Sequence, residues 1–438
     1  MKKVVLFSMV FLSLFILNAQ EKTPITKTGW NFGGLPTITF DTDLGFQYGA
    51  MVNLYHYGDG SRFPKYNHSL YFEVSRFTKG SGINRFFYDS DKLIEGLQTS
   101  LDISFLSDKA YDFFGFNGFN AVYQADWIDQ EANGYKTRMY YKYDRNLFRA
   151  KLDIQGKLAG NFRWITGFNF QKFKVKEVDL EKMNKGKDAN DEDYLDPIPG
   201  LFSRYKNLGI IKTEEADGGF VPTFKAGLVF DTRDNRPNPM KGIWTEAVVE
   251  AAPKILGAES SFSRMTLIHR QYFTIVPKDL SLVYRLAYQT TLGGEVPFYY
   301  KSQVMTSFMT GALSEGLGGG KTVRGILRNR VVGDGFFYGN VEARWKFVRF
   351  TFIKNNWYLG LNSFLDFGKI TKEIKISDSA INANPDLFKK DAEKFHTTYG
   401  AGLRIVMNEN FVIAVDYGRA TNKQDGKSGM YIGLNYLF

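Results

Sequence analysis

The amino-acid sequence predicts an all-β protein, a 16-stranded antiparallel transmembrane β-barrel. Three observations point to this fold. The first residues have the order of an export signal. Long segments alternate between apolar and polar residues, and their polar faces carry charges that no dry core would accept. Beyond residue 20, no apolar stretch approaches the roughly 20 residues that a membrane helix needs.

Residues 1–20 are predicted to be a cleaved signal peptide. Lys2 and Lys3 precede an apolar run over residues 4–17, and Asn18-Ala19-Gln20 follows it. This order of basic, apolar and small residues is typical of secretory signals. A transmembrane anchor is the alternative, but the run is short for a span. We expect residues 21–43 to be a short periplasmic segment and residues 44–438 to be the outer-membrane barrel.

Alternation with a period of two residues predicts the strands. In residues 148–155, Phe, Ala, Leu and Ile share one face, and Arg, Lys, Asp and Gln share the other. Strands of a soluble sandwich would also alternate but average ~5 to 6 residues, whereas strands that cross a bilayer obliquely need ~9 to 11. The segments here run long, and their apolar faces often end in aromatic residues. The predicted strands cover residues 44–56, 68–79, 94–105, 118–127, 135–143, 147–157, 162–175, 221–230, 242–252, 260–275, 280–291, 335–349, 356–368, 398–406, 411–418 and 429–438.

Composition limits the chemistry. The chain of 438 residues has no cysteine, which excludes disulfides, thiolate metal sites and thiol catalysis. Its formal net charge of +10 is spread along the sequence. This distribution argues against a nucleic-acid patch and favours anionic membrane surfaces, so outer-membrane lipid and lipopolysaccharide are expected partners and nucleic acid is not.

Loop lengths indicate which end of the barrel faces outward. The longest predicted connections, residues 176–220, 292–334 and 370–396, all follow odd-numbered strands, as extracellular loops do in even-numbered bacterial barrels. The first is acidic over residues 188–196. A calcium site is the alternative to a solvated loop there, but the spacing lacks the order of an EF-hand. We expect no metal and no cofactor.

The end of the chain alternates in the same way. Leu434, Tyr436 and Phe438 continue an apolar face that includes Met430 and Ile432. A final amphipathic strand that ends in an aromatic residue resembles the signal by which outer-membrane barrels are recognised for assembly. The resemblance implies the assembly machinery as a partner, and an ordinary closing strand is the alternative.

Three motifs lie in order along the second half of the chain. The first follows Phe230 and contains Asp231, Arg233, Asp234, Pro239 and Gly242. The second is a Gly-rich stretch followed by Val323, Arg324, Gly325 and Ile326. The third comprises Phe-Leu-Asp-Phe-Gly around Asp366 and Gly-Ala-Gly-Leu-Arg ending at Arg404. In this order they resemble the motifs of the BamA/TamA family of outer-membrane assembly factors and protein translocators.

The resemblance implies that residues 292–334 form a loop inserted into the lumen. Strand alternation places Asp366 and Arg404 on the lumen face, so Arg324 is expected to reach Asp366 and form a charge-assisted bond. Exchanging the two charges should then restore folding that either single change loses. An exposed loop charge is the alternative for Arg324. Ile326 departs from the family, which usually has Tyr or Phe there.

The resemblance also bears on activity. Family members that insert or secrete proteins usually carry polypeptide-transport-associated domains before the barrel, and residues 21–43 are too short for a domain of ~50 residues. The histidines fit neither a nucleophile elbow nor a zinc-protease helix, so no enzyme is expected. We expect a barrel that assists outer-membrane protein assembly or translocation with a separate periplasmic or surface partner. The alternative is a passive pore or a structural subunit of a surface complex.

Overall fold

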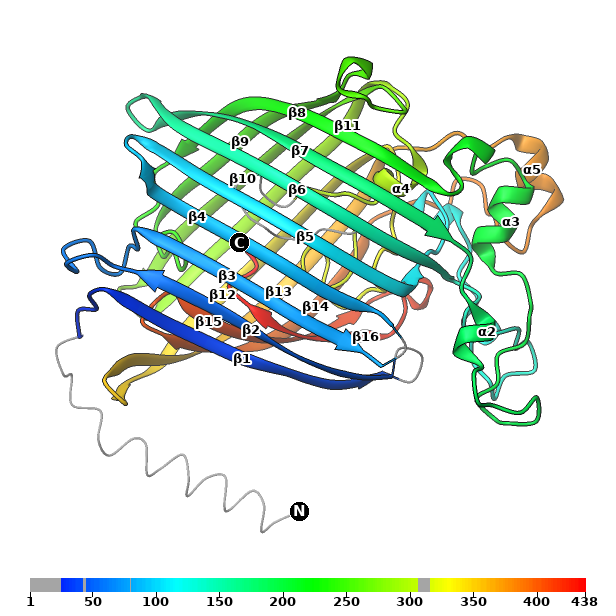
Figure 1. Ribbon diagram of the computed structural model, residues 1–438, viewed down its shortest axis with the longest axis horizontal. Helices are drawn as coiled ribbons and strands as arrows, with labels where there is room; N and C mark the ends of the chain where they lie inside the picture. The colour runs from blue at the N-terminus through cyan, green and yellow to red at the C-terminus, as the bar shows by residue number, and fades with distance from the viewer. Residues whose placement is uncertain (1–24, 42–44, 79, 306–315) are drawn as a thin grey trace, which may run out of the picture.

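One sheet of sixteen antiparallel strands forms the protein, and each strand pairs with the next in chain order. This computed structural model describes residues 25–41, 45–78, 80–305 and 316–438. The sheet curls round into a barrel (Figure 1), so the predicted fold class and strand number are confirmed. The predicted signal peptide lies outside the described residues. The strands are β1 Trp30–Asp41, β2 Gly45–His56, β3 His68–Phe77, β4 Gly82–Ile94, β5 Leu97–Asp112, β6 Lys142–Ala159, β7 Phe162–Lys176, β8 Gly218–Asp231, β9 Gly242–Ala252, β10 Phe262–Val276, β11 Leu280–Gly294, β12 Gly335–Phe352, β13 Asn355–Lys372, β14 His396–Met407, β15 Phe411–Ala420 and β16 Ser428–Leu434.

Short helices lie in the connections between strands. The α-helices are α2 Leu180–Met183, α3 Leu201–Asn207, α4 Phe298–Lys301 and α5 Asp378–Ala383. The 3-10 helices are η1 Gly118–Asn120, η2 Ala125–Trp127, η3 Thr213–Glu215, η4 Lys254–Leu256 and η5 Lys423–Asp425. Within the part of the chain that the structure describes, no helix has the length and apolar character to cross a membrane.

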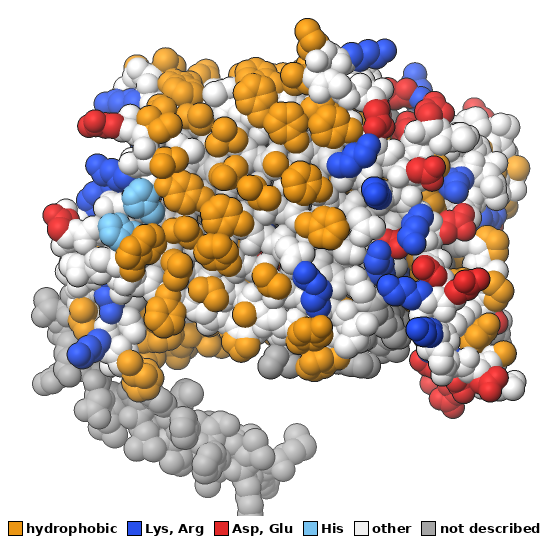
Figure 2. Space-filling view, in the orientation of Figure 1, with side chains coloured by type: hydrophobic (Ala, Val, Ile, Leu, Met, Phe, Trp, Pro, Cys, Tyr) orange, Lys and Arg blue, Asp and Glu red, His pale blue; other side chains and the backbone are white. Residues whose placement is uncertain are grey.

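The two faces of the sheet differ as the alternation predicts. On β6, Phe148 is 46% exposed on the outer face, whereas Arg149 and Asp153 are buried on the lumen face. Apolar side chains cover the outer wall of the barrel, and charged side chains lie at both ends of it (Figure 2). An apolar belt between charged ends is the surface that a bilayer requires.

Two predicted strands are wrong. Residues 118–127 and 135–143 belong mostly to the connection between β5 and β6, which contains η1 and η2. Adjacent residues Tyr140 and Tyr141 are each only 1% exposed. In a strand with one face towards lipid, every second side chain is exposed. Two adjacent buried tyrosines therefore do not fit such a strand and belong to an enclosed cluster instead.

The sequence analysis did not predict two strands, β1 and β4. Gly33, Gly34 and Pro36 interrupt the alternation of β1, and the proline is accommodated because β1 is an edge strand. Consecutive aromatic residues Phe86 and Phe87 obscure the alternation of β4. The sheet begins at Trp30, so the expected boundary at residue 44 is wrong by the length of one strand.

Four long connections pack together at one end of the barrel, which we call the cap end. Residues 113–141, 177–217, 295–305 and 373–395 form this cap, and their aromatic residues share one buried cluster with the adjoining strand ends. The rings of Phe113 and Tyr205 lie 5.2 Å apart. Arg204 forms a 2.7 Å ion pair with Asp386 across two of the connections. The cap lies beyond the strands on the right of Figure 1.

A buried histidine joins the cap to the barrel rim. His396, the first residue of β14, places Nδ1 2.7 Å from Asp425 and Nε2 3.3 Å from Glu393. Its ring stacks on Phe119, with centroids 3.9 Å apart. Because both carboxylates can only accept hydrogen bonds when ionised, this geometry suits a doubly protonated imidazole.

β1 and β16 are the two ends of the sheet, and no backbone pairing joins them among the described residues. The neighbouring residues meet through side chains instead. Tyr55 on β2 donates a 3.0 Å hydrogen bond to the carbonyl of Asn410. The ring of Phe411 on β15 lies directly against Gly33 of β1, where a Cβ atom would be 2.4 Å from it. The barrel therefore has a seam that is packed but not hydrogen-bonded as a ladder.

Candidate functional site

The lumen contains a compact loop, residues 316–331, which belongs to the connection between β11 and β12. Leu317 and Val331 pair through two backbone hydrogen bonds and close the base of the loop. Gly318 donates a backbone hydrogen bond to the Thr322 hydroxyl, 2.9 Å away. With φ of +129°, a side chain at Gly318 would lie 2.1 Å from the Leu327 carbonyl, so only glycine fits this turn.

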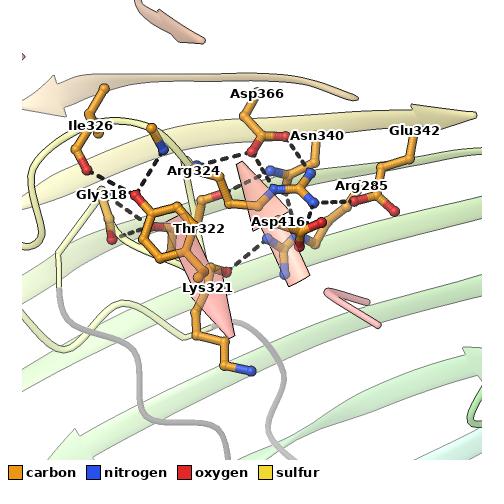
Figure 3. A network of polar contacts seen from close by, with 12 residues as sticks. Arg285, Gly318, Lys321, Thr322, Arg324, Ile326, Asn340, Glu342, Asp366 and Asp416 are labelled. Carbon is orange, nitrogen blue, oxygen red and sulfur yellow. Dashed lines mark hydrogen bonds and ion pairs between the residues drawn. The ribbon is translucent and has the colours of Figure 1, made fainter. Parts of the chain in front are cut away.

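Arg324 lies at the tip of this loop and is completely buried. Its Nε and Nη2 atoms donate to the two carboxylate oxygens of Asp366 on β13, at 2.8 and 2.9 Å. Its backbone N–H also donates to Asp366, at 3.0 Å, and its guanidinium stacks 3.5 Å above the ring of Phe364. The sequence-predicted pair therefore meets in the bidentate geometry typical of strong arginine–carboxylate bonds (Figure 3).

Two further carboxylates surround the same guanidinium. Arg324 Nη1 lies 2.7 Å from Glu342 on β12 and 3.3 Å from Asp416 on β15. Burial alone would lower the pKa of Arg324, but Asp366 and Glu342 together raise it above its usual value. The tip thus carries a permanent positive charge enclosed by three acidic residues of three strands.

The predicted partner Arg404 reaches the loop indirectly. It donates to both oxygens of Asp416, at 2.8 and 3.0 Å, and Asp416 in turn contacts Arg324. Arg344 holds Glu342 through one hydrogen bond, from Nε to Oε2, at 2.7 Å. These two arginines neutralise Asp416 and Glu342, and Arg324 neutralises Asp366.

Close backbone packing seats the rest of the tip. Gly325, with φ of +100°, lies against Gly418 of β15, where a Cβ would be 2.6 Å from the Gly418 carbonyl carbon. Gly325 N–H also donates to the hydroxyl of Tyr431 on β16, at 2.9 Å. Val323 and Ile326 are buried in one apolar cluster with wall residues, so isoleucine is enclosed at the position where the family that the motifs resemble usually has Tyr or Phe.

Lys321 precedes the tip and points away from the network into the lumen (Figure 3). Its side chain keeps accessible surface, yet the barrel surrounds it. Burial, with the nearby charge of Arg85, lowers the pKa of Lys321 to about 8. A cation is therefore less favourable here than in free solution.

Comparison with known proteins identifies the family. The profile described as the Omp85 superfamily domain matches residues 65–438. The chain belongs to the Omp85 superfamily. Barrels of this superfamily are transporters and insertases, so the expectation that the protein is not an enzyme is confirmed. Membership also places the barrel in a bacterial outer membrane.

Two solved structures with this Omp85 fold are distant in sequence. BamA from Haemophilus ducreyi lacking POTRA domains 1–3 gives a TM-score of 0.51 at 13% identity, covering 93% of this chain and 69% of that one. CdiB from Escherichia coli gives 0.52 at 10% identity, covering 94% of this chain and 62% of that one. The chain therefore spans less than two thirds of CdiB. A comparison with curated protein sequences finds no match.

The turn motif of the Omp85 chain lies between β8 and β9, at the end of the barrel opposite the cap, which we call the turn end. Asp231 accepts bonds from the backbone and guanidinium of Arg233, at 3.0 to 3.2 Å. Asp234 Oδ1 accepts three backbone N–H groups of the same turn. Gly242 has φ of +109°, and Pro239 is buried. These residues fold the connection itself.

The same connection reaches across the turn end. Arg236 donates to Gln98 on β5, at 2.6 Å. Asn238 is buried and donates to the hydroxyl of Tyr358 on β13, also at 2.6 Å. The connection thus extends across this mouth of the lumen to two distant walls, which its sequence did not suggest.

The C-terminal residues differ from the expected strand. β16 ends at Leu434, and Asn435 has φ of +72°. Met430 is exposed on the outer face, but Tyr436 and Phe438 are buried inside the barrel. The expectation that these two rings continue the outer apolar face is wrong, because the chain turns into the lumen at Asn435.

Sequence reasoning did not assign Glu342, Asp416 or Tyr431 to the site. Glu342 lies within the predicted strand at residues 335–349, and the alternation of polar and apolar residues there could have suggested that it faces the lumen. Asp416 and Tyr431 contact the tip from the last two strands, and only the curvature of the sheet brings them there. Among the residues described, no group of three or more His, Cys, Asp or Glu side chains is arranged so that it could hold a metal ion.

Proposed function

We propose that the protein assists insertion of proteins into the outer membrane, or their translocation across it, together with a separate periplasmic or surface partner. The observation that carries the proposal is the clasped lumen loop. A buried guanidinium bound to Asp366 and enclosed by Glu342 and Asp416 resists opening of the lumen, because removing it would leave the buried Asp366 carboxylate uncompensated. An Omp85 barrel built this way is suited to guiding chains rather than to steady conduction.

Two other features support the same reading. The cap packs a buried aromatic cluster at the end with the long connections, and the turn between β8 and β9 extends across the other end. The seam between β1 and β16 is the part of the wall without a backbone ladder among the described residues. A passive pore or a structural subunit of a surface complex remains the alternative class.

The proposal includes the orientation and assembly of the chain. Export through residues 1–20 would deliver it to the outer membrane, with the cap end outside and the turn end in the periplasm, since long connections of bacterial barrels are extracellular. Leu434, Tyr436 and Phe438 would then serve as the signal read by the assembly machinery. Lipid and lipopolysaccharide would contact the outer wall.

Planar-bilayer conductance and a reconstituted insertion assay test the proposal together. Purified protein should give small, flickering currents, and liposomes that contain it should speed the folding of an added unfolded outer-membrane barrel protein. Cross-linking in native membranes should capture the partner. Large steady currents without any acceleration of folding would favour the pore and contradict the proposal.

A further inference from the structure

The outer face of β7 ends in three lysines. Its outward-facing side chains are, in order, Phe162, Trp164, Thr166, Phe168, Phe170, Lys172, Lys174 and Lys176. All three lysines are exposed, whereas Phe173 and Val175 between them are buried. A tilted strand crosses the hydrocarbon of a bilayer in ~9 to 11 residues, and residues 162–170 have this length. The lysines therefore lie just beyond the apolar belt, where Figure 2 shows basic side chains next to the cap.

Basic side chains of neighbouring elements extend these lysines into a row. Lys109 on β5 places its Nζ 3.4 Å from Asn146 on β6, and Asn146 is the cross-strand neighbour of Lys174. Lys182 on α2 comes to the same place, because a Cβ atom at Gly80 would lie 3.2 Å from Lys182 Nζ and 3.8 Å from Lys109 Cγ. We call Lys109, Lys172, Lys174, Lys176 and Lys182 the lysine row.

Two carboxylates partly neutralise one end of the lysine row. Asp144 is buried and lies 3.2 Å from Lys109 and 3.5 Å from Lys176. Asp179 lies 3.9 Å from the same Lys176. Lys109 and Lys176 are therefore held by the protein itself.

The other lysines of the row are available to an external anion. Lys172 lies 3.2 Å from Glu259, but both side chains are about half exposed, and such a surface pair is weak. Within the described part of the chain, Lys174 and Lys182 form no ion pair. A row of ammonium groups with so few carboxylates attracts a ligand that carries more than one negative charge.

Exposed aromatic rings lie directly below the lysine row on the same outer surface. Phe148 on β6 is the cross-strand neighbour of Lys172, and Phe105 on β5 is the neighbour of Phe148. Phe170 is the previous outward-facing residue of β7, and all three rings are exposed. A ligand that contacts both the rings and the lysines needs an apolar part and an anionic part. This combination describes a lipid with a charged headgroup and not a soluble polyanion.

We propose that the lysine row and the rings below it form a binding site for a phosphorylated glycolipid of the outer leaflet. The acyl chains lie against Phe105, Phe148 and Phe170, and the headgroup phosphates accept hydrogen bonds from the ammonium groups. The choice of leaflet rests on the proposed function, which puts the cap end outside. The site adds a defined lipid partner to that function, and it lies near the middle of the strand order, away from the seam between β1 and β16.

Lysine footprinting of the wild-type protein tests the site without any substitution. The purified full chain in dodecyl maltoside is acetylated with and without diphosphoryl lipid A, and the modified peptides are quantified by mass spectrometry. Lipid A should slow acetylation of the lysine row about fivefold or more. Lys375, Lys389 and Lys390 are exposed on the connection between β13 and β14 and should react as before. No protection of the row, or equal protection of the three controls, would overturn the proposal.

A variant of the row measures its contribution to affinity. Lys172→Gln with Lys174→Gln and Lys182→Gln leaves Asp144 both of its lysine partners, so no buried carboxylate loses its ion pair. Lipid A binding, followed by native mass spectrometry, should weaken about tenfold to a hundredfold, since each basic side chain near an anionic membrane surface contributes about a fivefold factor.

A matched variant carries the same change of charge elsewhere on the surface. Lys375→Gln with Lys389→Gln and Lys390→Gln should bind lipid A as the wild type does. Equal affinities of the two triple variants would overturn the proposal.

Two further ligands identify what the row recognises. Lipid A without its phosphates should bind the wild type at least tenfold more weakly, and equal binding would overturn the role of the ammonium groups. Dextran sulfate that protected the row as well as lipid A does would overturn the lipid and favour a soluble polyanion. Lipid A binding without any insertion activity would refute the proposed function and leave the site standing, whereas insertion activity without lipid A binding would do the reverse.

Discussion

Replacing Arg324 by methionine should destabilise the barrel more than any single surface change. The hydrogen bonds that Asp366 accepts within the described structure all come from Arg324, and both residues are completely buried. Glu342 keeps Arg344, and Asp416 keeps Arg404. The substitution therefore leaves only the Asp366 carboxylate without a partner. Breaking a buried ion pair in this way lowers the free energy of unfolding by about 3 to 5 kcal/mol.

Unfolding by guanidinium chloride in detergent, monitored by tryptophan fluorescence, measures this loss as a decrease in the apparent free energy of unfolding. The double variant Arg324→Met with Asp366→Asn should recover most of it, because the uncompensated charge is gone. Arg349→Met is the control, since an exposed ion pair is worth about 0 to 1 kcal/mol. A loss below about 1 kcal/mol for Arg324→Met, or a double variant as unstable as the single one, would refute the reasoning.

The charge exchange that the sequence suggested is expected to fail. Arg324→Asp would place a carboxylate beside Glu342, which now lies 2.7 Å from the guanidinium. Two like charges in a buried space destabilise each other, so Asp366→Arg restores only part of the stability. The same titration measures it, and full recovery would show that Glu342 is unimportant for the tip.

Three further changes probe other parts of the molecule. Gly325→Ala should destabilise the loop by about 1 to 3 kcal/mol through its positive φ and the contact with Gly418, measured by protease resistance, whereas Gly433→Ala, with open space around it, should not. Lys321→Met should raise the melting temperature below pH 8, where the unfavourable charge is present, and the advantage should fade as pH rises from about 8 towards 10.5. Phe113→Ala should cost the cap about 3 to 5 kcal/mol, seen as faster proteolysis of the long connections with barrel circular dichroism unchanged.

The alternation of residues was sufficient to predict most of the sheet. It succeeded where a strand has lipid on one side and lumen on the other, as on β6. It failed at β1, where Gly33 packs under Phe411 and needs no side chain of its own. It also failed in residues 118–143, where rings cluster with Tyr205 from another connection. Such contacts between distant segments leave no period in the local sequence.

Only the part of the site that lies in a motif or on a predicted strand face could be predicted from the sequence. Asp366 was predicted from both its motif and its strand face, and it forms the expected bonds with Arg324 in the lumen. The roles of Glu342 and Asp416 depend on the curvature that brings β12 and β15 to the same tip. The inward turn at Asn435 depends on the residues that surround Phe438 inside the barrel, which belong to other strands.

The composition of the cap has a consequence for the order of folding. Its core joins Phe113 to Phe388, and Asn117 donates to the Ile374 carbonyl at 2.8 Å. Because these partners are far apart along the chain, this core cannot close until almost the whole polypeptide has arrived, and such long-range closure is slow. During folding, the cap should therefore become resistant to protease among the last steps, and this resistance marks a completely folded chain.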